Sequence, residues 1–147
     1  MKLEYVADHE PFYKKYSSDA GLDICSPRSF IVGSKKSYFL RTGIRIKPPK
    51  VPFFLRPWIT YGILVVARSG LSVKSNLEVG AGLIDYHYRG EFGIQLYNWS
   101  QSPLFFEKGS RVAQLMFIPV LKINKFKKVT EFKETDRGEK GIGSTGI

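Results

Sequence analysis

Apolar and polar residues alternate with a period of two along much of the chain, which predicts a protein built from β-strands. The segment 92–98 (Phe-Gly-Ile-Gln-Leu-Tyr-Asn) alternates as a half-buried strand should. Two denser apolar runs, 63–66 and 112–120, are rich in branched and aromatic residues and predict strands buried on both faces. Further strands are predicted over 37–40 and 42–47.

Proline and glycine punctuate these segments, for example at 47–49 and 107–110. Many short strands at such spacing are typical of a sandwich or barrel. One short helix is predicted from about Gly70 to Lys74, because Ser69 before it is a favoured N-cap residue. The pattern therefore predicts an all-β domain with one short helix.

The chain has 147 residues, of which 43% are hydrophobic, as expected for one ordinary globular domain. No apolar run is long enough to span a membrane, and the early charges at the N-terminus argue against a signal peptide. The single cysteine, Cys25, is interpreted as a small, partly buried residue rather than a nucleophile. A reducing compartment, cytoplasmic or nuclear, is predicted.

The net charge of +10 suggests an anionic partner, which could be nucleic acid, an acidic membrane surface or a polyphosphate. The charge could also serve solubility alone, and by itself it does not choose among these explanations. From about residue 122 the composition turns to charges and glycines. The final stretch, 137–146, fits neither a dinucleotide-binding turn nor a Walker A loop. Its glycines, hydroxyls and arginine suit either phosphate binding or a disordered tail.

Two internal segments carry further candidate chemistry. In 67–72, an arginine, a serine and a glycine follow a predicted strand and could present donors to an anion. For the tripeptide in isolation, a capped turn with a solvated arginine is the preferred interpretation. In 80–90, Asp85 follows an apolar pair and could act as a general base at the edge of a dry pocket; a turn aspartate is the alternative.

Taken together, these segments resemble a known family, the trimeric dUTPases. The five matching motifs run in family order at 20–24, 67–71, 82–90, 109–115 and 137–146. The resemblance implies a jelly-roll-like β-barrel, homotrimeric assembly and Mg²⁺-dependent hydrolysis of dUTP to dUMP and pyrophosphate. It also implies a β domain over 1–121, followed by a segment, 122–147, whose flexible arm completes a neighbouring subunit's site.

The resemblance assigns roles residue by residue. Asp85 would activate the water that attacks the α-phosphorus, and Asp23 would hold Mg²⁺ indirectly through its water shell. Arg137 would oppose charge in the manner of an arginine finger. Phosphate oxygens would be bound by Arg68, Ser69, Gly70, Gln114, Gly143, Ser144 and Thr145.

Base and sugar selection would come from the hairpin of the third motif. Backbone groups of Gly82, Leu83 and Ile84 would read the uracil edge, and the Tyr88 ring would reject a 2′-hydroxyl. A core aromatic is the alternative for Tyr88. Arg111 is expected to be structural, pairing within or between subunits.

The match departs from the family in three places. Ile142 replaces a phenylalanine that stacks on the uracil, so weaker arm closure and a higher KM are expected. Lys140 and Ala67 replace a small residue and a proline. The loop 50–60 is longer and more aromatic than in the family, and is either a surface excursion or a partner contact.

Three other functions are consistent with parts of the sequence. A dUTPase-like regulator would keep the fold without the reaction. A basic nucleic-acid-binding protein would account for the charge, although it leaves the motif residues unexplained, so no specific nucleic-acid partner and no membrane partner are expected. A dCTP deaminase relative would share the fold but fit the third and fifth motifs less well.

Overall fold

The computed structural model describes residues 2–135 and 138–139. In these residues the chain forms eleven strands and one helix, α1 (Ser69–Ser75). The strands are β1 (Glu4–Val6), β2 (Phe12–Tyr13), β3 (Leu22–Cys25), β4 (Phe30–Val32), β5 (Ser37–Lys47), β6 (Ile59–Val66), β7 (Leu77–Gly80), β8 (Leu83–Ile84), β9 (Phe92–Asn98), β10 (Leu104–Phe106) and β11 (Arg111–Leu121).

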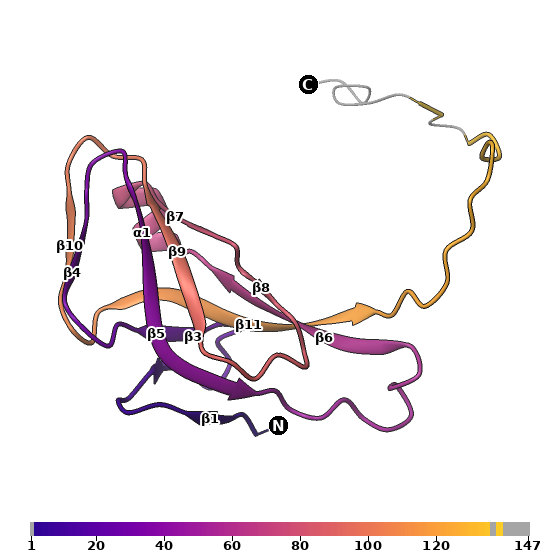
Figure 1. Cartoon of the computed structure of the whole chain (residues 1–147), viewed down its shortest axis with the longest axis horizontal. Coiled ribbons are helices and arrows are strands. Elements are labelled where there is room, and N and C mark those ends of the chain that lie inside the picture. Colours follow the sequence, from indigo (N-terminus) through magenta and orange to yellow (C-terminus); the bar gives the residue numbers. More distant parts are fainter. Residues whose placement is uncertain (1, 136–137, 140–147) are drawn as a thin grey trace.

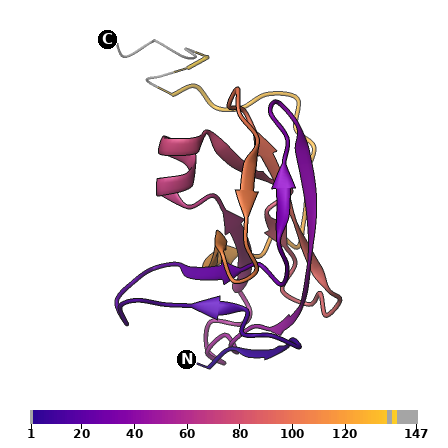
Figure 2. The same cartoon turned by 90° about the vertical axis from the view of Figure 1, so that its left-hand side faces the viewer.

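The strands pair into three antiparallel sheets. One sheet has the order β1-β5-β9-β7, a second has the order β2-β3-β11-β6-β8, and a two-stranded sheet joins β10 to β4. Figures 1 and 2 show the strands around a common interior with α1 on the outside. The expected all-β, jelly-roll-like fold with one short helix is confirmed, although the strands form separate sheets rather than one continuous barrel.

One hydrophobic core lies between the two larger sheets. Strand β9 shows why it forms, since every second residue from Phe92 to Asn98 is buried, as the alternation predicted. These side chains pack against fully buried residues of β5 and of the five-stranded sheet, among them Leu40, Ile63 and Leu115. Burial of aliphatic surface at about 25 cal/mol per Å² is the main force that holds the sheets together.

The two strands predicted at 37–40 and 42–47 are one strand, β5, with a bulge. The register with β9 shifts between Arg41 and Ile44, and Gly43 within the shift has φ +71°. The buried hydroxyl of Thr42 holds the bulge by donating to the Phe92 carbonyl and accepting from the Ile44 amide. The break in the alternation at Gly43 marks this bulge rather than a strand end.

The helix begins one residue earlier than the sequence indicated. Arg68, not Ser69, occupies the N-cap position, and it makes no side-chain capping bond. The amides of Leu71 and Ser72 both donate to the Arg68 carbonyl, at 2.9 Å each, so the first turn closes on the main chain. The C-terminus is capped by Asn76 in the left-handed conformation (φ 50°).

Burial on both faces, predicted for 112–120, holds only for the first half of β11. Val112, Ala113 and Leu115 are buried, but Ile118 and Val120 keep 39% and 38% of their surface exposed. These exposed positions alternate with core positions, so they share the outer face of the five-stranded sheet. In the isolated chain this outer face is apolar and only partly covered.

After β11 the chain leaves the body of the protein, as Figure 1 shows in orange and yellow. Residues 122–135 contain no helix or strand and are exposed throughout. The segment is tied to the body at its start, where the Lys122 amide donates to the Trp58 carbonyl at 2.8 Å. Of the helices in the described part of the chain, none has the length and apolarity needed to cross a membrane.

Candidate functional site

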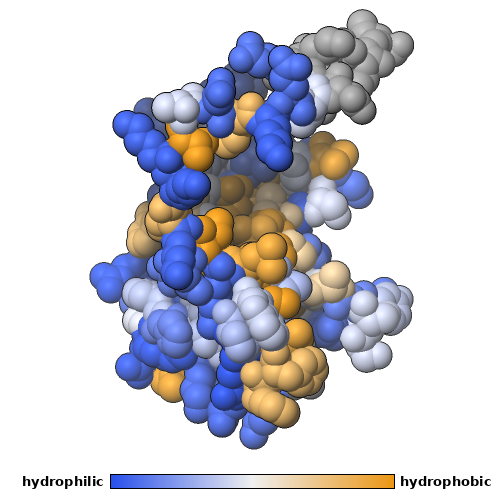
Figure 3. All heavy atoms as spheres, turned by 90° about the vertical axis from the view of Figure 1, so that its right-hand side faces the viewer, coloured by the Kyte–Doolittle hydropathy of each residue, from blue (hydrophilic) through white to orange (hydrophobic). Residues whose placement is uncertain are grey.

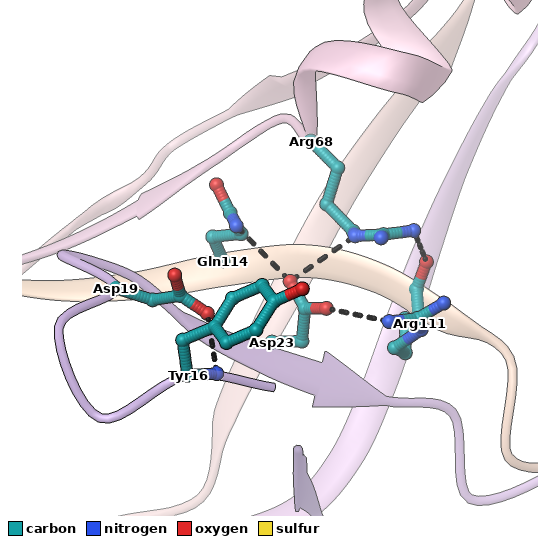
Figure 4. Close-up of polar contacts among 6 residues, drawn as sticks. All are labelled: Tyr16, Asp19, Asp23, Arg68, Arg111 and Gln114. Carbon is teal, nitrogen blue, oxygen red and sulfur yellow. Dashed lines mark hydrogen bonds and ion pairs between the residues drawn. The ribbon is translucent and has the colours of Figure 1, made fainter. Parts of the chain in front are cut away.

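A buried carboxylate, Asp23 on β3, is surrounded by three donor side chains, two from β11 and one from the turn after β6 (Figure 4). Its Oδ1 accepts from Arg68 Nε and from Gln114 Nε2, both at 3.1 Å. Its Oδ2 lies 3.4 Å from Arg111 Nη1. Asp23 is only 7% exposed, so its charge is stabilised by these donors rather than by bulk water.

Sheet register explains why these residues meet. Asp23 and Gln114 are direct cross-strand partners on β3 and β11, so their side chains leave the sheet on the same face. Arg111 lies three positions before Gln114 and would point to the opposite face of a regular strand. The β-bulge between Arg111 and Ala113 reverses this alternation and brings the guanidinium to Asp23.

Arg68 reaches the cluster from the end of β6, where the chain turns into α1. Besides Asp23, its Nη1 donates to the Arg111 carbonyl at 3.2 Å, which fixes the plane of the guanidinium. The next two residues, Ser69 and Gly70, start the helix and are exposed. Amides in a first helical turn have no intrahelical acceptor, so these can donate to an anion. The predicted Arg-Ser-Gly group is therefore assembled beside Asp23.

Two further residues, which sequence reasoning did not select, shape this cluster. The Arg111 guanidinium lies over the Tyr13 ring, 4.8 Å from its centroid. Asp19 Oδ2 accepts from the Tyr16 amide at 3.0 Å and closes the turn that leads into β3 (Figure 4). No sequence spacing links Tyr13 to Arg111, because the contact depends on β2 and β11 both flanking β3.

The second group of predicted residues surrounds a pocket at the other edge of the same sheet. Asp85 lines a cavity of about 650 Å³, together with Leu83, Ile84, Gly62 and Val120 on its apolar side. Asp85 is exposed, and among the described residues no donor or cation engages its carboxylate. A carboxylate in that setting is free to accept a proton from water.

The turn after Ile84 has the geometry that the sequence suggested for an aspartate turn. The Tyr88 amide donates to the Asp85 carbonyl at 3.0 Å. Tyr88 is 46% exposed, so the alternative of a core aromatic is wrong. Its hydroxyl donates to the Glu91 carbonyl at 2.8 Å, which holds the ring against Gly90 at the surface.

Strand β8 forms the open edge of the five-stranded sheet and determines which of its backbone groups are free. The Val65 amide donates to the Gly82 carbonyl at 2.7 Å, and Leu64 faces Leu83 one step further along. Because bonded and non-bonded pairs alternate in an antiparallel ladder, the Leu83 amide and carbonyl point away from β6. One donor and one acceptor are thus presented side by side at the edge.

Close packing at the start of this edge requires glycine at position 82. A Cβ atom at position 82 would lie 2.1 Å from the Val65 carbonyl oxygen, well inside van der Waals contact. The Gly82 carbonyl already accepts from the Val65 amide, so of the two polar backbone groups of Gly82 only the amide can join the free Leu83 groups in reading a base.

The Asp23 cluster and the Asp85 pocket do not meet within one chain. Three strand spacings, about 14 Å, separate β3 from β8 across the sheet. Gln114 faces Val66 whereas Ile84 faces Ile63, which adds about 10 Å along the strands. By alternation, however, Asp23, Gln114 and Leu83 lie on the same outer face, the face that carries Ile118 and Val120.

The residues near Asp23 do not form a direct metal site. Within the described ranges, no group of three or more His, Cys, Asp or Glu side chains lies close enough to hold a cation. Both acceptor positions of Asp23 Oδ1 are used by Arg68 and Gln114, and Oδ2 keeps one free. A single free acceptor fits a water molecule, and hence an ion bound mainly by water and phosphate oxygens, as Mg²⁺ prefers.

Cys25 follows Asp23 by two residues on β3 and is half-buried. Burial, together with the negative charge of Asp23, raises the pKa of the Cys25 thiol above its ordinary value. A raised pKa disfavours the reactive thiolate, which agrees with the interpretation of Cys25 as a structural residue. The predicted site residues of the last motif (Arg137, Ile142, Gly143, Ser144 and Thr145) lie outside the described residues.

Comparison with known proteins identifies the family. The family model described as dUTPase matches residues 8–146. A deoxyuridine 5'-triphosphate nucleotidohydrolase of Legionella pneumophila is 39% identical over 139 residues, covering 89% of this chain and 84% of the relative. The fowlpox virus protein of the same name is 34% identical, covering 92% and 88%.

Solved structures agree with the sequence relatives. The dUTPase of Staphylococcus bacteriophage 80alpha with dUpNHpp superposes with a TM-score of 0.83 at 25% identity, covering 99% of both chains. The native dUTPase of EIAV shares the fold, with a TM-score of 0.69 at 21% identity, covering 91% of this chain and all of that one. The protein therefore belongs to the dUTPase family and is a dUTP diphosphatase, an enzyme that hydrolyses dUTP to dUMP.

Proposed function

We propose that the enzyme cleaves dUTP between the α- and β-phosphates, with Mg²⁺, at sites assembled from more than one copy of the chain. The observation that carries this proposal is the separation of the Asp85 pocket from the Asp23 cluster on one sheet face. A nucleotide that has its base at Leu83 and its α-phosphorus near Asp85 lies out of reach of its own chain's Arg68 group and needs such a group from elsewhere. The Arg68 group of a second copy supplies one.

The outer sheet face supports assembly. Ile118, Val120 and Leu83 are apolar and exposed on it, and Leu83 keeps 70% of its surface accessible. Partly exposed apolar patches of this kind mark protein–protein contacts. Burial of this face between copies accounts for the dense apolar runs in the sequence, and the three-fold closed ring implied by the family uses the same contact at each interface.

The domain division predicted from the sequence fits this assembly. The β domain ends with β11 at Leu121, and the extended segment that begins at residue 122 leaves the body (Figure 1). A segment that packs little against its own body is suited to reach another copy. We infer that it delivers the last motif to that copy's site, where Arg137, Gly143, Ser144 and Thr145 bind the outer phosphates and Ile142 covers the base.

The chemistry follows from the positions of the side chains. The Asp85 carboxylate accepts a proton from a water molecule as the water oxygen forms a bond to the α-phosphorus. The bond from that phosphorus to the bridging oxygen breaks, and pyrophosphate leaves with the electron pair. Arg68, Gln114 and the amides of Ser69 and Gly70 bind the phosphate oxygens, whose charge they oppose in the transition state. Mg²⁺, when bound, supplies further charge neutralisation on the phosphate chain.

Selectivity follows from the free edge of β8. The Leu83 amide and carbonyl, with the Gly82 amide, match the alternating acceptors and donor of a uracil edge. Cytosine presents a donor where uracil has an acceptor and leaves these groups unpaired, which costs far more than a missing apolar contact. The exposed Tyr88 ring is held by its hydroxyl bond to the Glu91 carbonyl. It is therefore rigid enough to exclude a 2′-hydroxyl.

The test is pyrophosphate release from dUTP, UTP and dCTP with Mg²⁺, comparing the natural protein with Asp85→Asn. Asp85→Asn removes the proton acceptor at constant size and should reduce kcat by a factor of about 100 or more. Glu10→Gln removes an equally exposed carboxylate elsewhere and should retain full activity. Unchanged kcat in Asp85→Asn would exclude Asp85 as the base.

Subunit mixing tests the shared site. Asp85→Asn and Arg68→Gln should each be inactive, and co-assembly in equal amounts should return about a quarter of the natural activity, because that fraction of shared sites receives both natural residues. Sites formed within a single chain would give no recovery. Thermal melts of the two variants verify that each is folded.

A further inference from the structure

The long loop between β5 and β6 encloses a basic cavity that the proposed reaction does not use. Residues 48–58 fold into two turns, in which the Leu55 amide donates to the Pro52 carbonyl and the Trp58 amide to the Leu55 carbonyl, both at 3.0 Å. A cavity of about 340 Å³ lies between this loop, the start of β6 and the turn after β8. Figure 3 views this end of the molecule, where apolar side chains at the centre are bordered by hydrophilic ones.

The polar lining of the cavity is cationic. Lys50, Arg56 and Lys122 contribute charges and His87 contributes a ring; among the described residues, no aspartate or glutamate lines the cavity. None of the three cations forms an ion pair within the described part of the chain. Glu4, whose pKa is lowered mainly by Lys47 and slightly by the charge of Lys50, already pairs with Lys47 at 2.6 Å.

Main-chain contacts hold two of the cations in place. Arg56 Nε donates to the Val51 carbonyl at 2.9 Å, and Lys122 Nζ donates to the Arg56 carbonyl at 2.6 Å. The rest of the guanidinium and two ammonium protons remain free to donate. Three unpaired cations grouped around one cavity repel each other, and an anion bound between them removes that repulsion.

We propose that this cavity binds the phosphate group of a small anion. The free guanidinium protons, the ammonium groups and the Thr60 hydroxyl form the donor set that phosphate oxygens favour. Val51, Ile59 and Tyr86 supply apolar walls beside the cations, which suit the organic part of a phosphate ester. The site is separate from the Asp23 cluster, and it does not depend on the proposed catalytic roles.

The cavity adjoins the Asp85 pocket. Thr60, Tyr86, His87 and Lys122 line both spaces. A phosphate bound here is therefore a neighbour of the nucleotide rather than a part of it, and the two ligands must be titrated separately.

The experiment measures binding of inorganic phosphate and of dAMP by calorimetry to the full-length protein saturated with dUpNHpp, at constant ionic strength in chloride. Saturation blocks the nucleotide site, and adenine does not match the uracil-reading edge. We expect both ligands to bind the natural protein. Tighter binding of dAMP would identify a phosphate ester as the occupant, and equal binding would identify the phosphate group alone.

Matched variants decide whether the named residues bind the anion. Lys50→Ala combined with Arg56→Ala should weaken phosphate binding about tenfold or more, as expected when charge-assisted hydrogen bonds are lost. Lys74→Ala combined with Lys108→Ala removes the same charge at exposed positions outside the cavity and should leave binding unchanged. The single change Lys50→Glu, at an exposed residue, should abolish binding without affecting the fold.

Two results would overturn the proposal. Equal binding by the natural protein and the Lys50/Arg56 variant would show that the cavity is not the site. Equal weakening in the Lys74/Lys108 variant would show that only net charge matters. Thermal melts of all variants verify folding. Because the readout is binding, loss of dUTP hydrolysis in any variant would not change the conclusion.

Discussion

Replacement of Gly82 by alanine tests both the packing of β8 and its proposed role in reading the base. The new Cβ atom would lie 2.1 Å from the Val65 carbonyl oxygen, so the two strands must move apart by about 1 Å to reach ordinary contact. Such a shift breaks the 2.7 Å bond from the Val65 amide to the Gly82 carbonyl. It also displaces the free Leu83 groups from the base edge.

The expected loss of stability can be estimated from these two effects. One main-chain hydrogen bond contributes about 0.5–1.5 kcal/mol, and overpacking against main-chain atoms costs about 1–3 kcal/mol. The free energy of unfolding should therefore fall by about 2–4 kcal/mol. In a chain of this length such a change lowers Tm by roughly 6–12 °C.

The assay combines thermal unfolding with steady-state kinetics on dUTP. Gly70→Ala is the matched control for stability, because a Cβ at position 70 meets nothing within 4 Å and alanine favours the helix. Gly70→Ala should leave Tm unchanged or raise it, whereas Gly82→Ala should lower Tm and raise KM for dUTP. A Gly82→Ala protein with natural Tm and KM would refute the assignment of β8 as a tightly packed base-reading edge.

Four further predictions concern residues elsewhere. Ile142→Phe should lower KM for dUTP two- to tenfold with kcat unchanged, since aromatic stacking adds about 0.5–1.5 kcal/mol; an unchanged KM in steady-state kinetics would contradict this explanation. Asp23→Asn should lower the free energy of unfolding, measured by urea denaturation, by about 1–3 kcal/mol, because it removes the negative charge and one of the two oxygens that pair with Arg68 and Arg111. The Gly43 amide, followed by Arg41, lowers the pKa of the Glu91 carboxyl below its ordinary 4.5. The interaction therefore stabilises the fold above the ordinary pKa and is lost as pH falls through the lowered one. Glu91→Gln should be less stable than the natural protein at pH 6, and the difference in Tm should shrink steadily in melts at pH values below 4.5. Iodoacetamide at pH 8 should modify Cys25 more slowly in the folded protein than in urea, because burial raises the pKa of its thiol; equal rates would show that the thiol is not shielded.

The sequence was most informative where local pattern and local structure coincide. Alternation predicted β9 over its full length, because a strand with one buried face requires that pattern. The same alternation gave a wrong strand boundary in β5, where Gly43 interrupts the pattern within a single bulged strand. A bulge depends on pairing with β9, and no property of residues 41–44 alone distinguishes it from a strand end.

Motif residues could be selected from the sequence, but their partners could not. Resemblance named Asp23, Arg68 and Gln114, whereas the stacking of Arg111 on Tyr13 follows only from the order β2-β3-β11. The same holds for the cavity formed by Lys50, Arg56 and Lys122, because Lys122 is 66 residues from Arg56 along the chain. Their proximity is created by the pairing of β6 with the end of β11.

By itself, the sequence determined the strand-rich class, the short helix and the family, because these depend on residue type and on spacing along the chain. Only the tertiary structure showed that the Asp23 cluster and the Asp85 pocket lie at opposite edges of one sheet face. Distance across a sheet is set by strand order and register, which are long-range properties. Hydrophobic burial stabilises the core, but the apolar pattern of a single segment does not specify which other strands will be its neighbours.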